Sequence, residues 1–166
     1  MGGIARETSH RGRLMESGLR IRSAVEADLA EIERIEKLSF ADPWSVSDFR
    51  SVMNISHAIF LVAVDQASSD LAGYVVTLAI VDESEVLNIA VDPAKRGGSI
   101  GARLLDAALA VAESKGASAT FLEVRESNAA ARRLYESRGF EEISRRRKYY
   151  RSPVEDALVL RRALQR

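Results

Sequence analysis

The sequence contains no cysteine, and none of its apolar runs approaches the roughly 18 residues that a membrane-spanning helix needs. Without thiols there are no disulfide bonds and no zinc sites built from thiolates, which agrees with a reducing cytoplasm, where we expect the protein. Its two histidines, His10 and His57, lack the spacing of metal ligands, so no metal site is predicted. No apolar segment follows the first charges, so we predict no signal peptide and no membrane association.

Net charge is absent too, because 24 Lys and Arg side chains balance 24 Asp and Glu side chains. The balance hides a segregation along the chain. Residues 23–92 carry three basic and thirteen acidic side chains, whereas residues 116–166 carry twelve basic and seven acidic ones. The pattern disfavours a uniform nucleic-acid-binding surface, and it agrees with a protein that has one anionic and one cationic face.

What is present suits a globular protein with one core. The chain has 166 residues, of which 46% are hydrophobic and 29% charged, and this length favours a single domain. Residues 1–18 lack hydrophobic periodicity and are rich in Gly, Arg and Ser. We therefore expect a disordered N-terminal extension over 1–18 and one domain over 19–166.

Hydrophobic periodicity predicts a mixed α/β (α+β) domain with the element order β-α-α-β-β-β-α-β-α-β-β. Helices are expected over residues 24–40, from a cap at Ser45 or Ser47 to residue 53, over 100–115, and from a cap at Ser127 or Asn128 to residue 138. Strands are expected over residues 19–22, 58–64, 72–81, 86–91, 120–124, 142–150 and 157–160, with polar turns at 66–70 and 82–85.

The segment over residues 87–105 is a candidate anion site. An apolar strand enters a short loop rich in glycine and basic residues, and the loop opens a long helix. Small residues let backbone N–H groups approach an anion at the helix N-terminus, and Lys95 and Arg96 add positive charge. An ordinary glycine turn explains the loop equally well. The glycine spacing fits neither a Rossmann loop nor a nucleotide P-loop.

The segment over residues 121–140 carries candidate acid–base residues. A strand places Phe121, Glu123 and Arg125 on one face, and the following helix places Asn128 and Tyr135 two turns apart on one side. A carboxylate near a strand end and a phenol on the adjacent helix suit general acid–base work. Taken by themselves, Glu123 also fits a structural ion pair, and Tyr135 fits a core aromatic.

The loop resembles the pyrophosphate loop of the GNAT acetyltransferases, which reads Arg/Gln-x-x-Gly-x-Gly/Ala before a long helix. Arg96, Gly101 and the Leu104-Leu105 pair match this pattern, whereas Ser99 stands where the family usually has its first glycine. A serine there restricts the backbone and adds bulk, so we expect looser approach to phosphates, for which its hydroxyl offers a compensating donor.

Other segments resemble one branch of that family, the RimI-like ribosomal-protein-alanine N-terminal acetyltransferases. They are Leu-Glu-Val-Arg-x-Ser-Asn-x-x-Ala-x-x-Leu-Tyr-x-x-x-Gly-Phe, Asp-Pro-Trp-Ser at 42–45, Asn-Ile-Ala-Val-Asp-Pro at 88–93, Arg-Lys-Tyr-Tyr-Arg at 147–151 and Glu-Asp-Ala at 155–157. The resemblance spans about residues 21–160 and implies a mixed, mostly antiparallel sheet of six to seven strands. About four helices would flank the sheet, and a splayed strand pair would form the acetyl-CoA cleft.

The resemblance also implies residue roles. Glu123 would be the general base, which deprotonates the amine directly or through water, and Tyr135 the acid that protonates the leaving thiolate. Trp44 is expected to lie half in the core and half against the substrate, and Tyr149 is expected to bind substrate. Alternation along their strand would place Tyr149 and Tyr150 on opposite sides, so that only one of them flanks the peptide groove. The residues implied to bind acetyl-CoA (coenzyme A) are Ile89, Ala90, Val91, Arg96, Gly97, Gly98, Ser99, Ile100, Gly101, Ala102 and Asn128.

The implied function is acetyl transfer from acetyl-CoA to a protein N-terminal α-amine, with the N-terminal alanine of a small-subunit ribosomal protein as the expected substrate and partner. Alternatives are another N-terminus, a lysine side chain, a small amine, or an inactive coenzyme-A-binding module. We expect a monomer or weak dimer without direct nucleic-acid contact. The basic run at 145–148 is interpreted as a solvated strand or as a surface near the ribosome.

Overall fold

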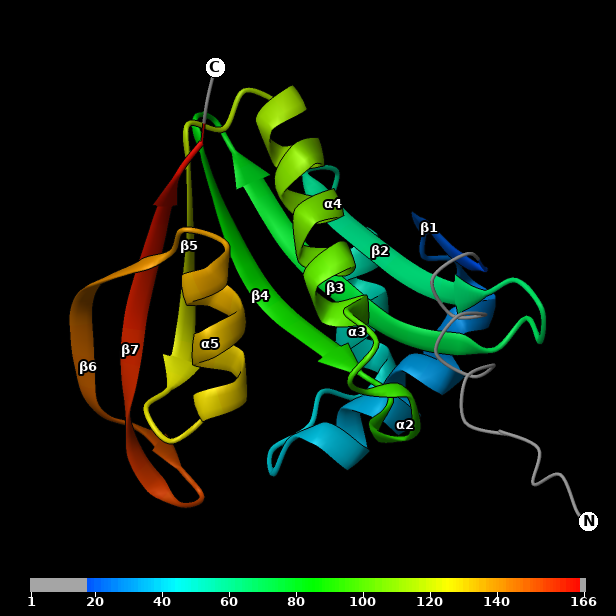
Figure 1. The fold of residues 1–166 in the computed structure, drawn as a ribbon, viewed down its shortest axis with the longest axis horizontal. Helices are drawn as coiled ribbons and strands as arrows, with labels where there is room; N and C mark the ends of the chain where they lie inside the picture. Colours follow the sequence, from blue (N-terminus) through cyan, green and yellow to red (C-terminus); the bar gives the residue numbers. More distant parts are fainter. Residues whose placement is uncertain (1–17, 165–166) are drawn as a thin grey trace, which may run out of the picture.

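The computed structural model describes residues 18–164, which form one seven-stranded sheet with helices on both faces (Figure 1). The strand order is β1-β2-β3-β4-β5-β7-β6, and every pairing is antiparallel except that of β4 with β5. The predicted mixed, mostly antiparallel sheet with about four helices is therefore confirmed. The extension predicted for residues 1–18 lies outside the described residues, apart from Gly18.

The chain enters through β1 (Leu19–Ser23), a 3-10 turn (η1, Glu26–Asp28) and the helices α2 (Leu29–Ser39) and α3 (Val46–Met53). The helix predicted over 24–40 begins later, because Asp28 binds the Val25 N–H at 2.8 Å and the Arg22 guanidinium, which shapes a 3-10 turn first. Ser45, one of the two predicted caps, accepts from the Asp48 N–H and starts α3.

The middle of the sheet consists of β2 (Ala58–Asp65), β3 (Leu71–Ile80) and β4 (Glu83–Val91). The turn predicted over 82–85 is wrong, because Glu83 already pairs with Ile80 and only Val81 and Asp82 form the turn. Glu83 and Glu85 are exposed strand positions that alternate with the buried Ser84 and Val86, so their charge gave a false turn signal.

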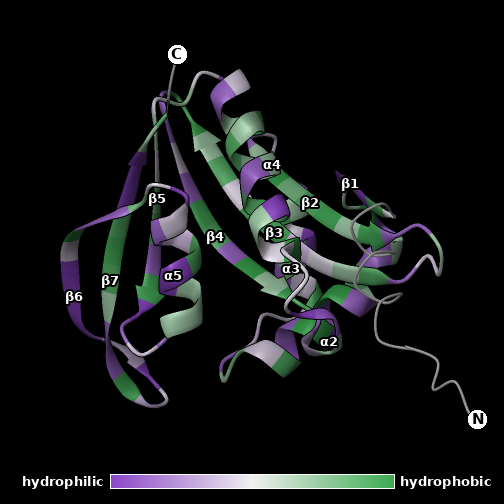
Figure 2. Cartoon of the chain, in the orientation of Figure 1, coloured by the Kyte–Doolittle hydropathy of each residue, from purple (hydrophilic) through white to green (hydrophobic). Residues whose placement is uncertain are grey.

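The second half contains a 3-10 turn (η2, Pro93–Lys95), α4 (Ile100–Ser114), β5 (Ala119–Arg125), α5 (Ala129–Ser137), β6 (Glu141–Arg151) and β7 (Val154–Ala163). Gly116 and Gly139, at φ +94 and +82, end the two helices as predicted, because few other residues adopt this backbone conformation. β6 is exposed and hydrophilic over nearly its whole length, as expected of an edge strand (Figure 2).

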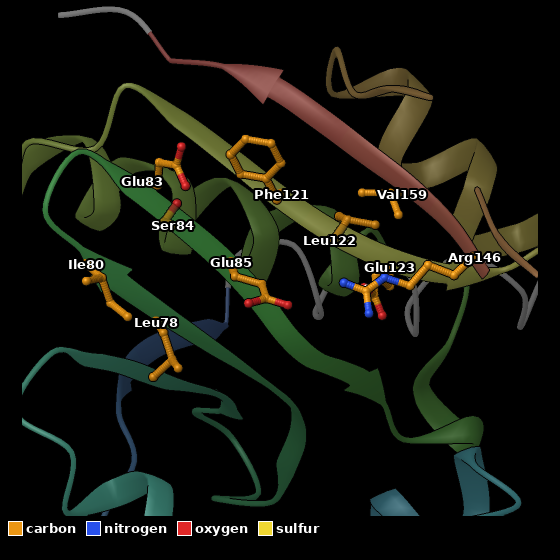
Figure 3. Close-up of a pocket in the computed structure, with 10 residues that line it drawn as sticks. All are labelled: Leu78, Ile80, Glu83, Ser84, Glu85, Phe121, Leu122, Glu123, Arg146 and Val159. Atoms are coloured by element: carbon orange, nitrogen blue, oxygen red, sulfur yellow. The ribbon is translucent and has the colours of Figure 1, made fainter. Parts of the chain in front are cut away.

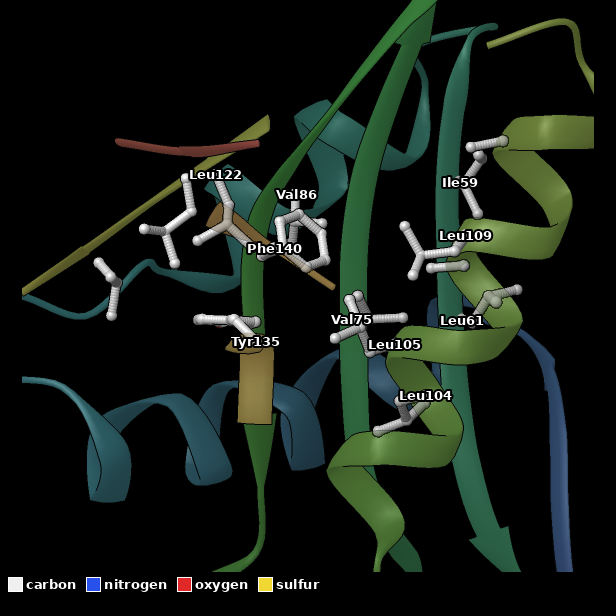
Figure 4. Packing of buried hydrophobic residues seen from close by; sticks show 14 of the residues in the cluster. Ile59, Leu61, Val75, Val86, Leu104, Leu105, Leu109, Leu122, Tyr135 and Phe140 are labelled. Carbon is white, nitrogen blue, oxygen red and sulfur yellow. The ribbon is translucent and has the colours of Figure 1, made fainter. Parts of the chain in front are cut away.

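Two apolar clusters lie on opposite faces of the sheet. One joins alternate residues of β2 and β3 to α4, β5 and α5, and includes Leu104, Leu105, Leu122 and Tyr135 (Figure 4). The other joins the intervening residues of these strands to α2 and α3. Because β2 is buried on both faces, its sequence Ala-Ile-Phe-Leu-Val-Ala-Val is apolar without alternation.

The pairing of β4 with β5 ends partway along the two strands. It extends only from Glu83 with Ala119 to Val86 with Leu122. Leu87 forms a bulge against β3 at the same level, since Thr77 pairs with Val86 and Val76 with Asn88. A bulge bends and twists its strand, which explains why β4 then diverges from β5. The predicted splayed pair is confirmed, and we call residues 87–91 of β4 and 123–125 of β5 the splay.

Candidate active site

The β4 side of the splay exposes backbone hydrogen-bonding groups toward β5. The Asp92 N–H donates to the Ala72 carbonyl of β3 at 2.8 Å. Backbone groups alternate in direction along an antiparallel strand, so Ala90 also faces β3, whereas Ile89 and Val91 direct their N–H and C=O groups into the splay. One of these groups is already used, because the Val91 carbonyl accepts from Arg96 Nε at 3.1 Å.

The loop before α4 connects the splay to a helix N-terminus. Ser99, immediately before the first helical residue Ile100, has φ +62, a left-handed conformation that favours glycine. The first-turn N–H groups, those of Ile100, Gly101 and Ala102, have no acceptor within the helix. Gly97 and Gly98 leave open space beside this turn, and the loop stays a candidate anion site.

The Arg96 side chain, which the sequence suggested as a positive charge for an anion, is hydrogen-bonded within the protein. Its guanidinium donates to the Val91 carbonyl and, at 3.1 Å, to Ser39 Oγ at the end of α2. It therefore connects the loop to β4 and α2. Gly101 lies against Val91 and Leu134, which brings the first turn of α4 close to α5.

Glu123 points from β5 into an open cavity of about 410 Å³ on the face opposite α4 and α5 (Figure 3). Arg146 Nε of β6 contacts Glu123 Oε1 at 2.8 Å. Glu85 of β4 lies on the same face; burial and the Glu123 charge raise the pKa of Glu85, against a smaller lowering by Arg146. The cavity is lined by Leu78, Ile80, Glu83, Ser84, Glu85, Phe121, Leu122, Glu123, Arg146 and Val159.

Tyr135 lies on the other face of the sheet. Its ring packs edge-on against Phe140 at 5.8 Å within the core, and only 6% of the residue is exposed (Figure 4). Burial raises the pKa of the Tyr135 hydroxyl, with a further contribution from Tyr150, so this phenol keeps its proton at neutral pH. Glu123 and Tyr135 thus flank β5 from its two sides, near where the splay opens.

Tyr149 and Tyr150 do not face opposite sides, as alternation predicted. Their rings meet edge-to-face at 5.1 Å, because a bulge in β6 lets residues 147–149 oppose a single residue of β7. Lys148 has φ +52 in this bulge, and its N–H donates to Asp156 Oδ1 at 2.9 Å. Both tyrosines lie near Glu123, whose charge is the largest contribution to the raised pKa of Tyr149.

Glu155 and Asp156, two consecutive carboxylates of β7, connect the strands and the helix of this region. The sequence indicated them only as part of the Glu-Asp-Ala motif. Asp156 also accepts from Arg145 at 2.9 Å. Glu155 accepts from the Ser127 N–H at 3.0 Å and from Arg125 at 3.3 Å, which places the start of α5. The guanidinium of Arg125 in turn stacks on Tyr150, 4.2 Å from the ring centroid.

The remaining predicted residues lie at the edges of the site. Asn128 is the N-cap of α5 and accepts from the Ala131 N–H at 3.1 Å, so its amide oxygen has a structural partner. Trp44 packs on Phe49 at 5.2 Å and borders a second open cavity of about 440 Å³, formed by α3 and the loop before it, with Asp42 and Asp48.

Sequence reasoning missed two charged residues that the fold brings into the site region. Glu36 is fully buried and accepts from Tyr74, from Asn88 of the splay at 2.8 Å and from the Trp44 N–H at 3.1 Å. Its signal was available, since a glutamate on the apolar stripe of α2 needs buried partners. Arg146 had no such signal within its basic run.

Among residues 18–164 no helix is long and apolar enough to span a membrane. The same residues contain no group of three or more metal-ligating side chains.

Comparisons with known proteins agree with this geometry. The acetyltransferase (GNAT) family model matches residues 29–140. The [ribosomal protein bS18]-alanine N-acetyltransferase of Escherichia coli is 36% identical over 142 residues, which cover 84% of this chain and 94% of the relative. The Haemophilus influenzae protein of the same name is 33% identical over 142 residues, 83% of this chain and 94% of the relative.

Solved structures agree as well. The crystal structure of the Escherichia coli ribosomal-protein-S18-alanine N-acetyltransferase superposes with a TM-score of 0.82 at 33% identity, over 89% of this chain and 95% of that one. Ard1 from Thermoplasma volcanium, at 24% identity and a TM-score of 0.83, shares the fold. The matched family model, these relatives and the splayed sheet together show that the chain belongs to the GNAT acetyltransferase family.

Proposed function

We propose that this enzyme transfers the acetyl group of acetyl-CoA to the α-amine of a protein N-terminus, specifically the N-terminal alanine of ribosomal protein bS18. The observation that carries the proposal is the splay, with the carboxylate of Glu123 on one face of the sheet and the protonated phenol of Tyr135 on the other. The substrate assignment is supported by the names of relatives that match over nearly their whole length.

The residues present fit acetyl-CoA. The free backbone groups of Ile89 and Val91 would bind the amides of its pantetheine arm, and the first turn of α4 with the loop over 96–99 would bind its pyrophosphate. When bound, acetyl-CoA supplies an activated acyl group on sulfur. Asn128 would contact its arm through the amide N–H₂ group, since the amide oxygen already caps α5.

Glu123 would prepare the amine. An α-amine has a pKa of about 8, so much of it is protonated at neutral pH and cannot attack a carbonyl carbon. A carboxylate in the acidic cavity attracts the ammonium and accepts its proton, directly or through water. The chain has no cysteine, and direct attack by the amine requires no covalent enzyme intermediate.

Tyr135 would protonate the departing sulfur. Because burial keeps the phenol protonated, it has a proton to donate from the face opposite the amine. The ammonium loses two protons on becoming an amide. One of them balances the proton that Tyr135 gives to sulfur and must regain, and the other leaves from Glu123 to solvent through the open cavity. Trp44 would contact the peptide because it borders an open cavity, and Tyr149 would do so because it lies near Glu123.

Replacement of the two proposed catalytic residues tests the mechanism. Glu123→Gln and Tyr135→Phe should each lower kcat for a peptide that begins Ala-Arg by about 10²–10⁴-fold, the usual contribution of a general acid or base. Initial rates of acetyl transfer measure this, with the exposed Glu142→Gln as a matched control. Unchanged rates in both variants would contradict the proposed mechanism.

The substrate proposal needs a separate experiment. Mass spectrometry of ribosomal protein N-termini, with and without the gene, should show bS18 losing its acetyl group. In vitro, a peptide that begins Ala-Arg, with its α-amine blocked and a lysine side chain free, should remain unmodified. Acetylation of the lysine, or of a small amine alone, would favour an alternative acceptor, and no transfer at all would favour an inactive coenzyme-A-binding module.

A further inference from the structure

Arg146 occupies the place where a substrate amine would have to meet Glu123. Its Nε lies 2.8 Å from Glu123 Oε1, in the cavity that the two side chains help to line (Figure 3). The two side chains differ in exposure, because that of Arg146 is 58% exposed and that of Glu123 only 19%. An exposed guanidinium on the edge strand β6 can move away at little cost in packing.

The remaining charged and titratable groups that face Glu123 do not replace this cation. β4 contributes Glu85 and β6 contributes Tyr149 and Tyr150, none of which is positive at neutral pH. Arg125 follows Glu123 on β5, but it is held by Glu155 and by the Tyr150 ring. Arg161 of β7 lies over Phe121 instead. Arg146 is therefore the cation that balances Glu123 among the described residues.

A guanidinium stays protonated at every working pH, so it neither gives nor takes a proton in the reaction. It also shields Oε1, the carboxylate oxygen that it contacts. An amine that binds Glu123 at Oε1 must consequently displace Arg146. The guanidinium has an alternative position nearby, since it already lies 5.4 Å from the Tyr149 ring centroid.

We propose that Arg146 is a placeholder for the substrate ammonium, which it yields to on peptide binding and replaces on Glu123 after acetylation. This inference rests on the proposed function and concerns the same site. The substrate enters as a cation and exchanges with a cation, so the acidic pair of Glu85 and Glu123 is never left without a counter-charge. The acetylated product is a neutral amide and cannot compete with the returning guanidinium, which favours product release.

The test compares Arg146→Ala with Arg147→Ala, a neighbouring arginine that forms no ion pair with any other of residues 18–164. At pH 8, loss of the placeholder should lower KM and Kd for the Ala-Arg peptide by about two- to fivefold, a modest change because exposed ion pairs are weak. KM for acetyl-CoA should stay unchanged, as should both constants in the control. Arg146→Gln should repeat the result if the alanine variant unfolds.

Two further measurements separate the outcomes. The affinity of the acetylated peptide, measured by calorimetry on the coenzyme-A-bound protein, should be the same in the wild-type and Arg146→Ala proteins, and the gain for the free amine should vanish in a Glu123→Gln background. An unchanged or raised peptide Kd in Arg146→Ala overturns the placeholder role. Full activity of Glu123→Gln would instead overturn the proposed mechanism, which is a distinguishable failure.

Discussion

At the scale of single residues, Ser99 has a strained backbone conformation that lowers the stability of the fold. Its φ of +62 places a serine in the left-handed region directly before α4, where the GNAT loop pattern usually has glycine. A residue with a Cβ atom loses about 1–2 kcal/mol there, whereas a glycine loses about 0.5–1 kcal/mol of extra chain entropy on folding. Strain relief therefore exceeds the entropy cost.

Ser99→Gly should accordingly raise the free energy of unfolding by about 0.5–1 kcal/mol. Coenzyme A affinity should be equal or higher, because the backbone can then approach a phosphate more closely. Urea unfolding and calorimetric titration measure the two effects. A variant that is less stable and binds coenzyme A more weakly would indicate that the Ser99 hydroxyl is a needed ligand.

At the scale of elements, β4 brings acidic side chains of the first half of the chain to Glu123 of the second half. Glu83 and Glu85 line the same cavity as Glu123. Replacement of both by glutamine should raise KM for a basic peptide by about three- to tenfold, since each exposed charge contributes about 0.2–1 kcal/mol. KM for acetyl-CoA should not change.

Steady-state kinetics with Ala-Arg peptides measure this effect, and Glu113→Gln on the exposed end of α4 is the control. A neutral peptide should lose less affinity than the basic one. Equal changes in KM for peptide and acetyl-CoA would show that β4 acts on the shape of the site rather than on the charge of the substrate.

At the scale of the whole molecule, two carboxylates that connect separate elements should set its acid stability. Asp28 binds Arg22 of β1, and Asp92 binds Arg34 of α2. Burial acts to raise both pKa values, but the arginines, assisted by backbone N–H groups, lower them overall. Each carboxylate therefore stabilises the folded state at pH values above its unfolded pKa, which is about 3.9.

This stabilisation should disappear as the pH falls through the unfolded pKa toward the lower folded values. We expect the free energy of unfolding to decrease below about pH 5, and the double variant Asp28→Asn, Asp92→Asn to show a smaller decrease. Urea titrations between pH 7 and 3 measure both slopes. Parallel slopes in the two proteins would assign acid sensitivity to other groups.

The sequence predicted most local structure because its signals act over a few residues. Ser45 and Asn128 are polar residues directly before periodic apolar stretches, and both prove to be helix caps. The turn predicted at residues 82–85 failed because a charged residue on the exposed side of a strand resembles a turn residue. Tyr149 and Tyr150 were misplaced because strict alternation does not apply within a bulge.

What the sequence by itself determined is the order and type of the elements, the position of the glycine-rich loop and the identity of Glu123 and Tyr135 as candidates. Only the tertiary structure decided that these two residues lie on opposite faces of the sheet and that β4 and β5 part after Val86 and Leu122. It also decided that Arg146 forms an ion pair with Glu123. The reason is physical. Periodicity and caps are read over a few residues of one segment, whereas the splay and the Arg146 contact arise from packing between segments far apart in the chain.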